Sequence, residues 1–295
     1  MKRVTTFSEA RQVLAARVGL VATMGYLHEG HLSLMQRAKG VCDTLVASIF
    51  VNPLQFAPGE DFENYPRDIE RDAALMASVG VDVLFSPSIE EMYPAEPSIR
   101  IVTSPLGDRL EGEGRPRHFD GVAMAVVKLF AGLRPDVAVF GRKDAQQLAI
   151  VRRLVRDLSF PVEIMGAPIT RESDGLALSS RNVRLSDSER TAALALHSGL
   201  VAAASLVEAG ERDGSVLEKV AATPIEAEPL LELHYAELTD AAELTRLPKL
   251  SSDAFLAVSA QAGSVRLIDN FHIIGGLPEI GIRLDHPSIV YQGGQ

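Results

Sequence analysis

Residues 20–40 read LVATMGYLHEGHLSLMQRAKG and place an apolar run, a glycine-containing loop and a helical pattern in immediate succession. The run at residues 20–22 is long enough for a buried strand. From His31 the apolar residues recur at helical spacing until Gly40 ends the pattern. The stretch therefore predicts a strand, a loop and a helix, with His28 and His31 at the start of the helix.

The start of this helix is suited to an anion. The N–H groups of a first helical turn favour negative charge, and the glycines allow a phosphate to approach the backbone. Two imidazoles beside these donors fit a triphosphate. The alternative is that both histidines are ordinary core or surface residues and that the glycines only form a turn.

Composition and charge limit the class of protein. The chain has 295 residues, of which 46% are hydrophobic and 23% charged, as in ordinary soluble globular proteins. Lys and Arg number 29 against 39 Asp and Glu, so the formal charge of −10 argues against a general surface for nucleic acid or anionic membranes. An anionic ligand would need a local basic cluster.

The same composition indicates a cytoplasmic protein. Cys42 is the only cysteine and permits no internal disulfide, which is consistent with a reducing compartment. We expect it to pack in the core. The N-terminus lacks the apolar core of a signal peptide, and we expect no stretch as long as a membrane span.

Short apolar segments alternate with helical patterns through the first 185 residues. This alternation predicts an α/β fold, a Rossmann-like parallel sheet domain over residues 1–185. Strands are expected at residues 20–22, 44–51, 81–85, 137–140 and 162–169, and helices at 5–18, 31–40, 65–80, 121–133 and 144–158.

The pattern changes near Ser186, and residues 186–295 are predicted to form a smaller C-terminal α+β domain with an extended tail. Helices are expected at residues 189–209 and 215–222, and half-buried strands at 230–238, 254–260 and 264–268. The tail from Gly275 is predicted to be loop-like.

Unusual polar residues follow four of the predicted strands. They lie at residues 24–31, at Asn52 and Gln55, at 141–144 and at 171–182. Ligands of parallel sheets bind at the carboxyl ends of the strands. We therefore expect the four segments to converge on one rim.

Each of these segments also has a simpler explanation. Lys143 at a helix start is unfavourable beside the helix dipole unless an anion shares the site, but it could equally be a solvated lysine. Ser179, Ser180 and Arg181 could clamp a phosphate or form a cap with a surface arginine. Asn52 and Gln55 suit a small carboxylate or hydroxyl substrate, although such residues more often form turns. His118 is expected to close its loop rather than serve the site.

Several catalytic motifs are missing. The chain has no G-x-S-x-G elbow, no P-loop, no G-x-G-x-x-G after the first strand and no Cys/His array for zinc. The remaining inventory is cationic and hydrogen-bonding, without a protein nucleophile. Such a set fits transfer of a nucleotidyl group to a bound substrate.

Four motifs together resemble the pantothenate synthetase (pantoate–β-alanine ligase) family, within the HxGH nucleotidylyltransferase superfamily. They have the order and spacing of that family, and the similarity extends from about residue 1 to Asn270. The motifs are TMGYLHEGH at residues 23–31, VNPLQF at 51–56, GRKDAQQ at 141–147 and SSRN at 179–182.

The resemblance implies an ATP-dependent ligase. Pantoate and ATP would give pantoyl adenylate and pyrophosphate, and β-alanine would then displace AMP to give pantothenate. It also implies Mg²⁺ with the ATP, a homodimer, and a second domain that partly covers the site, with no nucleic-acid or membrane partner. The glycine-bearing loop between Pro58 and Tyr65 is a candidate lid.

The resemblance also implies the site residues. His28, His31, Lys143 and Arg181 would be catalytic, with His31 as the proton donor. Gln55 and Gln147 would bind pantoate or β-alanine, with Asn52 close by, and Asp72 would lie near Mg²⁺. The residues that would bind ATP are Met24, Gly25, Tyr26, Leu27, His28, Glu29, Gly30, His31, Gly141, Arg142, Lys143, Asp144, Thr170, Leu178, Ser179, Ser180 and Arg181.

The chain departs from the family pattern at four positions and in its tail. Arg142 stands where Glu is usual, and it would add positive charge near ATP. Ala145 replaces an aromatic residue, Ala22 a proline and Thr170 a valine. The tail beyond about His272 exceeds the usual end of the family.

Two other functions remain open from the sequence. A nucleotidylyltransferase would transfer AMP to a phosphate substrate, although the amide-rich pair Gln55 and Gln147 favours a carboxylate-hydroxyl substrate. A non-catalytic module would bind ATP without turnover.

Overall fold

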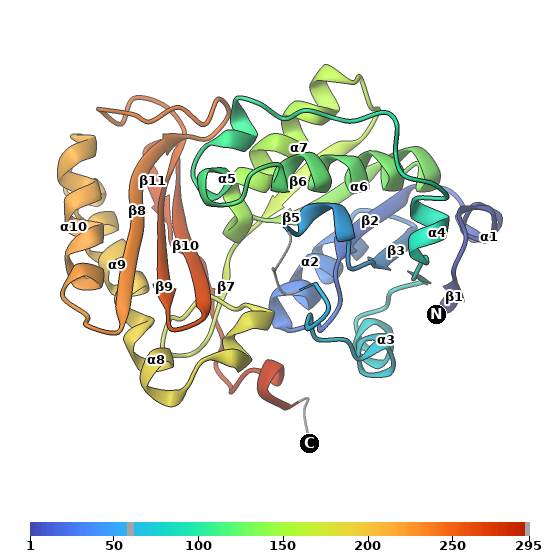
Figure 1. Ribbon diagram of the computed structural model, residues 1–295, viewed down its shortest axis with the longest axis horizontal. Coiled ribbons are helices and arrows are strands. Elements are labelled where there is room, and N and C mark those ends of the chain that lie inside the picture. Colours follow the sequence, from blue (N-terminus) through green and yellow to red (C-terminus); the bar gives the residue numbers. More distant parts are fainter. Residues whose placement is uncertain (58–61, 293–295) are drawn as a thin grey trace. The chain divides into compact units, whose positions relative to one another are not determined.

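The computed structural model describes residues 1–57 and 62–292, and the chain forms two compact units (Figure 1). The first unit comprises Met1–Leu27, His31–Gly141 and Gln146–Ala167. The second comprises His28–Gly30, Arg142–Ala145 and the described part of Pro168–Gln295. Within the predicted lid at residues 58–65, residues 58–61 lie outside the described part of the chain.

The first unit is built on a six-stranded parallel sheet, as the alternating pattern predicts. Its strand order is β1-β4-β3-β2-β5-β6. The order reverses at β2, which lies between β3 and β5, and such a switch point is where ligands of open α/β sheets bind. The strands are β1 (Lys2–Val4), β2 (Val18–Thr23), β3 (Thr44–Ile49), β4 (Val83–Phe85), β5 (Val137–Gly141) and β6 (Glu163–Ala167).

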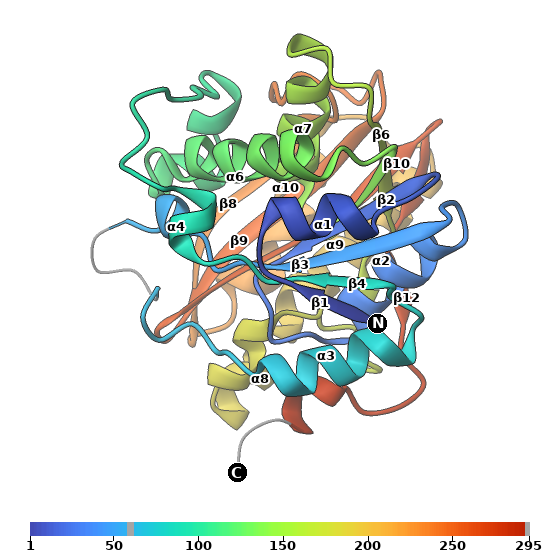
Figure 2. The same ribbon diagram turned by 90° about the vertical axis from the view of Figure 1, so that its right-hand side faces the viewer.

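Helices cover both faces of this sheet (Figure 2). α2 (Glu29–Lys39) and α3 (Ile69–Ser78) pack on one face, where Met35 and Met76 join a fully buried cluster and Cys42 packs against it. α1 (Phe7–Val13), α6 (His118–Leu133) and α7 (Ala145–Asp157) lie on the other face (Figure 2). Two four-residue helices, α4 (Ile89–Met92) and α5 (Glu111–Gly114), lie between β4 and α6, where no helix or strand was expected from the sequence.

Local chemistry explains where α1 and α3 begin and why the sequence did not predict β1. Thr6 caps α1 in a reciprocal capping box with Glu9. α3 begins at Ile69 rather than near Tyr65, because the Asp68 side chain accepts a hydrogen bond from the Arg71 N–H. β1 was not predicted because it has only three residues and two of them, Lys2 and Arg3, are exposed at the sheet edge.

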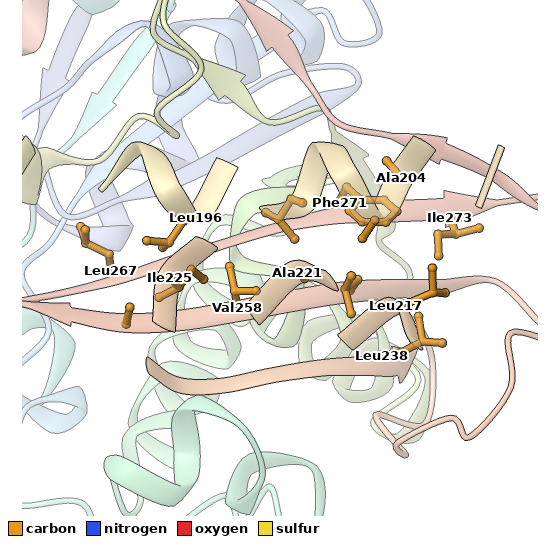
Figure 3. Close-up of a cluster of buried hydrophobic side chains, with 14 of the residues drawn as sticks. Leu196, Ala204, Leu217, Ala221, Ile225, Leu238, Val258, Leu267, Phe271 and Ile273 are labelled. Carbon is orange, nitrogen blue, oxygen red and sulfur yellow. The ribbon is translucent and has the colours of Figure 1, made fainter. Parts of the chain in front are cut away.

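The second unit contains a four-stranded antiparallel sheet covered on one face by two helices, which confirms the predicted α+β character. The strand order is β11-β10-β9-β8. Leu196, Ala204, Leu217 and Phe271 belong to the buried cluster between this sheet and the helices (Figure 3). The elements are α8 (Asp187–Ala192), α9 (Leu194–Glu208), α10 (Gly214–Glu226), β8 (Leu231–Asp240), β9 (Ala254–Ala262), β10 (Val265–Ile274) and β11 (Leu277–Glu279).

The units divide the chain earlier than the boundary expected at 185/186. Residues 168–185 belong with the second unit because β7 (Thr170–Arg171) pairs with β12 (Ile282–Arg283). Arg171 also forms a buried, bidentate ion pair with Asp269 of β10, with N–O distances of 2.6 and 2.9 Å. These contacts tie the segment to the antiparallel sheet.

One helical stretch of the described residues, Asp187–Glu208, is long and apolar enough to cross a membrane. The expectation that no stretch reaches this length is therefore wrong. Half of its most apolar part is buried inside the protein, and Leu196, Leu200 and Val207 pack into the cluster of the second unit. The apolar residues thus belong to the core of this unit.

The described part of the tail, residues 275–292, contains two short strands and a 3₁₀ helix, contrary to the prediction of a loop. Gly275 and Gly276 have φ of +58° and +82° and form the two-residue turn between β10 and β11. β12 then pairs with β7, and a short 3₁₀ helix, η5 (Ile289–Gln292), follows. Glycine composition alone suggested a loop, whereas these glycines form a hairpin turn.

Candidate active site

The loop after β2 is held in an unusual backbone conformation by a buried carboxylate. Gly25 has a φ of +85°, and Tyr26, at +51°, lies in the left-handed region that non-glycine residues rarely adopt. Asp72 of α3 accepts hydrogen bonds from the N–H groups of Tyr26 and Leu27, at 2.7 and 2.8 Å. The Arg71 guanidinium donates to the Leu27 carbonyl and lies over the Tyr26 ring. α3 therefore fixes the shape of the loop.

These contacts of Asp72 do not fit its predicted place near Mg²⁺. Its side chain is 1% exposed and both oxygens accept backbone N–H groups. Burial raises the pKa of the Asp72 carboxyl, although the two N–H groups oppose this shift. Among the described residues, no group of three or more His, Cys, Asp or Glu side chains could hold a metal ion. Asp72 is therefore a structural brace.

His28 is a buried imidazole whose orientation follows from its contact with Gly30. The Gly30 N–H donates to His28 Nδ1 at 3.2 Å, and His28 is 7% exposed. Because Nδ1 accepts, the proton of the neutral ring lies on Nε2. His28 can therefore donate from Nε2 while uncharged. His31, half-buried, lies three residues after His28, in the first turn of α2.

Asn52 organises the segment after β3. It is 1% exposed, and its Nδ2 donates to the Gly121 carbonyl at 3.0 Å and to Gln55 Oε1 at 3.1 Å. Its Oδ1 accepts from the Tyr93 hydroxyl and the Leu54 N–H. The four contacts use the whole amide, so Asn52 positions Gln55 and is itself fully bonded within the protein.

Gln55 is held from several directions. Its Nε2 lies 3.2 Å from Met24 Sδ, so the predicted ATP loop and the predicted substrate residue are brought together in the first unit. His118 Nδ1 donates to the Gln55 carbonyl at 2.7 Å, which gives His118 the loop-closing role expected from the sequence. Gln147 lies in the first turns of α7 and is half-buried.

The turn that carries Lys143 is anchored by β10. Arg142, Lys143 and Asp144 form a 3₁₀ turn before α7. Asn270 Nδ2 donates to the Lys143 carbonyl at 2.7 Å and to the Arg142 carbonyl at 3.2 Å, and His272 Nε2 donates to the latter at 3.1 Å. These bonds restrain the backbone of the turn, while the Lys143 ammonium lies 3.7 Å from Asp144.

Arg142 does not add unbalanced charge. Its guanidinium forms an ion pair with Glu279 of β11. Local sequence indicates extra positive charge at residue 142 but carries no sign of its partner carboxylate, which lies 137 residues further along the chain.

The SSRN segment begins a 3₁₀ helix, η4 (Ser180–Arg184). The Ser179 hydroxyl caps it by accepting from the Arg181 N–H at 3.2 Å. A backbone bond from Leu178 N–H to the Thr170 carbonyl places these two predicted ATP residues side by side. Asn182 Nδ2 donates to Glu172 and to the Ala177 carbonyl. These two bonds hold the segment to the residues that precede it.

The predicted site residues are divided between the two units, and each set lies within its own unit. The first unit carries Met24, Gly25, Tyr26, Leu27, His31, Asn52, Gln55, Asp72, Gly141 and Gln147. The second unit carries His28, Glu29, Gly30, Arg142, Lys143, Asp144, Thr170, Leu178, Ser179, Ser180 and Arg181.

Sequence reasoning missed the residues that support these segments. Tyr93, Asn270 and His272 hold Asn52 and the Lys143 turn. As single polar residues in a loop or within a strand pattern, they carried no local signal.

The fold and this geometry define a class of protein, the Rossmann-like α/β proteins in which an HxGH motif starts the helix after the strand at the switch point. Comparison with known families narrows this class. The model of the family described as pantoate-beta-alanine ligase matches residues 1–272. The chain belongs to this family and is an ATP-dependent ligase.

Individual relatives agree. The chain is 49% identical to pantothenate synthetase of Heliobacterium modesticaldum over 270 residues, covering 92% of this chain and 96% of the relative. It is 50% identical to that of Geobacillus kaustophilus over 264 residues, covering 90% and 87%.

Solved structures give the same result. Pantothenate synthetase of Thermus thermophilus superposes with a TM-score of 0.89 at 45% identity, covering 93% of this chain and all of that one. Pantoate-beta-alanine ligase of Francisella tularensis, complexed with beta-gamma ATP and beta-alanine, has a TM-score of 0.74 at 32% identity, covering 92% and 97%.

Proposed function

We propose that this chain joins pantoate to β-alanine in two chemical steps. A pantoate carboxylate oxygen attacks the α-phosphorus of ATP, and the bond to pyrophosphate breaks. The β-alanine amine then attacks the acyl carbon, loses its proton, and releases AMP. The observation that carries this proposal is the family match over residues 1–272, which spans every segment of the candidate site.

The cationic and imidazole side chains would stabilise the phosphates. The carboxylate of pantoate is the nucleophile, so the reaction needs no protein nucleophile. Charge builds up on the α-phosphate and on the departing pyrophosphate. We assign His28, His31, Lys143 and Arg181 to these oxygens, with His31 as proton donor; a contact made only in such a transition state contributes about 3 kcal/mol. The Nε2 proton of neutral His28 supports its share of this role.

The neutral amides would bind the hydroxy acid. Gln55 and Gln147 are our candidates for pantoate or β-alanine contacts. The hydrogen bond from Asn52 to Gln55 Oε1 supports a positioning role for Asn52. An uncharged, hydrogen-bonding pocket suits a small substrate that bears both hydroxyls and a carboxylate.

The same proposal includes a metal ion, an oligomeric state and a cellular compartment. Mg²⁺ would enter with the ATP phosphates, because it keeps several waters and is commonly held through substrate phosphates. We also propose a homodimer in the cytoplasm. No step above is assigned to a protein-bound metal ion.

A coupled assay for AMP tests the proposal. We expect pyrophosphate release to require ATP and pantoate, and AMP release to require β-alanine as well. Lys143→Met should lose at least 100-fold in activity, since an electrostatic contact to the phosphates is removed. Lys219→Met, at an exposed position of α10, is the matched control and should keep full activity. Pyrophosphate release driven only by a phosphorylated acceptor would support AMP transfer instead, and ATP binding without turnover would support a binding module.

A further inference from the structure

Residues 277–291, which we call the strap, follow the part of the chain that matches the family model. Backbone pairing fixes the strap within the second unit. β11 pairs with β10, and β12 pairs with β7. Between them Gly281 has a φ of +111°, and a Cβ there would lie 2.4 Å from the Ile169 carbonyl oxygen. The strap is therefore closely fitted to the strand that precedes the SSRN segment.

The strap holds the first residue of α2. The Ser288 hydroxyl donates to Glu29 Oε2 at 2.7 Å, and the Ile289 N–H donates to Glu29 Oε1 at 2.7 Å. The Glu29 side chain is 12% exposed. A carboxylate at this helix start would repel a phosphate that binds the same turn. The two donors satisfy that carboxylate and fix it beside His28 and Gly30.

The strap also contacts the other two basic segments. Glu279 forms the ion pair with Arg142, next to Lys143. η5 packs against η4, which contains Ser180 and Arg181.

The carboxylate of Glu172 links the strap to η4, because it accepts hydrogen bonds from both. Glu172 is 5% exposed, and its Oε1 accepts from the Tyr291 hydroxyl at 2.7 Å and from Asn182 Nδ2 at 3.2 Å. The same strap thus reaches the helix start, the Lys143 turn and the SSRN segment.

We propose that the strap is a positioning element for ATP. It holds in register the three segments assigned to the triphosphate, and Ser288 is a positioning residue that acts through Glu29. This inference rests on the proposed function of those segments. It predicts that loss of strap contacts weakens ATP binding and leaves pantoate and β-alanine binding unchanged.

The test compares Ser288→Ala, Ser288→Thr and a chain ended after Leu284 with the full chain. Ser252→Ala is the matched control, because Ser252 donates to the exposed carboxylate of Asp240 at 2.9 Å, a bond of the same kind elsewhere in the second unit. Titration calorimetry measures the Kd of β,γ-methylene ATP, and steady-state kinetics measure KM for each substrate. We expect the Kd and the KM for ATP to rise about fivefold in Ser288→Ala and more than tenfold in the shortened chain. Ser288→Thr and Ser252→Ala should behave as the full chain.

An unchanged Kd in Ser288→Ala overturns the proposal. So does an equal rise in KM for all three substrates, because that result indicates a general loss of structure. If the shortened chain does not fold, Ser288→Ala still decides. If the full chain binds the analogue but forms no AMP from the three substrates, the proposed reaction fails, whereas the Kd comparison still decides the role of the strap.

Discussion

At the residue scale, the contact between Gly30 and His28 controls the orientation of an imidazole in the candidate site. A Cβ on Gly30 would lie 2.8 Å from His28 Cε1 and 2.9 Å from Nδ1. Gly30 has an ordinary helical φ, so the requirement is for space rather than for backbone freedom. From the sequence, this glycine is expected to let a phosphate approach the backbone. In the structure it also leaves room for the closely packed His28 imidazole.

Gly30→Ala should displace His28 and lower kcat/KM for ATP about 100-fold, which is the effect expected when one positioned donor to the phosphates is lost. Steady-state kinetics measure the change in kcat/KM, and circular dichroism checks that the variant keeps its fold. Gly40→Ala is the matched control at the other end of α2, where a Cβ would lie 3.5 Å from the Arg37 carbonyl oxygen, an ordinary contact. Equal kinetics in the two variants would contradict the role given to His28.

A second residue, His197, predicts how stability depends on pH. Burial, aided by Arg171 and Arg283 against the opposing Asp269 and Asp174, lowers its pKa to about 4. Its Nε2 accepts a hydrogen bond from the Arg283 guanidinium at 2.8 Å, so protonation there would break the bond and place two cations together. The folded state therefore binds fewer protons than the unfolded state between pH 6.5 and 4.

Stability should be greatest above pH 6.5 and should fall on acidification toward pH 4, with a contribution from His197 of at most about 3 kcal/mol. Urea unfolding at about pH 7.5 and about pH 5, on either side of the ordinary histidine pKa, measures the difference. His197→Gln keeps an acceptor for Arg283 without a titrating group, and it should flatten this part of the pH dependence. An identical slope in the variant would show that other groups cause it.

At the scale of elements, the ion pair between Arg171 of β7 and Asp269 of β10 holds the second unit together. Arg171 is fully buried and also donates to the Ile280 carbonyl of the strap at 2.6 Å. A planar guanidinium can serve these partners at once because its donors diverge in one plane. The sequence predicted β10 and the polar segment 171–182, but it could not pair them, since the two residues lie far apart in the chain.

Arg171→Met should reduce the free energy of unfolding by about 3–5 kcal/mol, because it leaves Asp269 as an unpaired buried charge. Denaturant titration measures this loss. The double variant Arg171→Met with Asp269→Leu removes both charges and should recover part of it. If the double variant loses the sum of both single effects, the two residues do not act as a pair.

At the scale of the whole molecule, the sequence predicted the fold class and most of the elements. Continuous apolar runs such as residues 44–51 and the alternation of strands with helices were sufficient for the parallel sheet. The sequence predicted a loop at Gly275 and Gly276, where the structure has a two-residue hairpin turn, because paired glycines are common in both loops and tight turns. The division of the chain into two compact units falls after Ala167 and depends on Arg171 and β7, which have no local signal in the sequence.

The candidate site was predicted unevenly for a physical reason. Signature segments carry their chemistry in adjacent residues, so the histidines, Lys143 and the serines could be proposed as site residues from local sequence. Their supports come from distant elements: Asp72 holds the β2 loop, Asn270 the Lys143 turn and Ser288 the start of α2. Such partners have no local pattern.

The central claim is that the carboxylate of pantoate attacks the α-phosphorus of ATP, and isotope transfer tests it most directly. Pantoate labelled with ¹⁸O in its carboxylate is turned over with unlabelled ATP and β-alanine, and the products are analysed by mass spectrometry. One ¹⁸O should appear in each AMP formed and none in pyrophosphate. AMP without the label, or label in released phosphate or pyrophosphate, would contradict an acyl-adenylate intermediate.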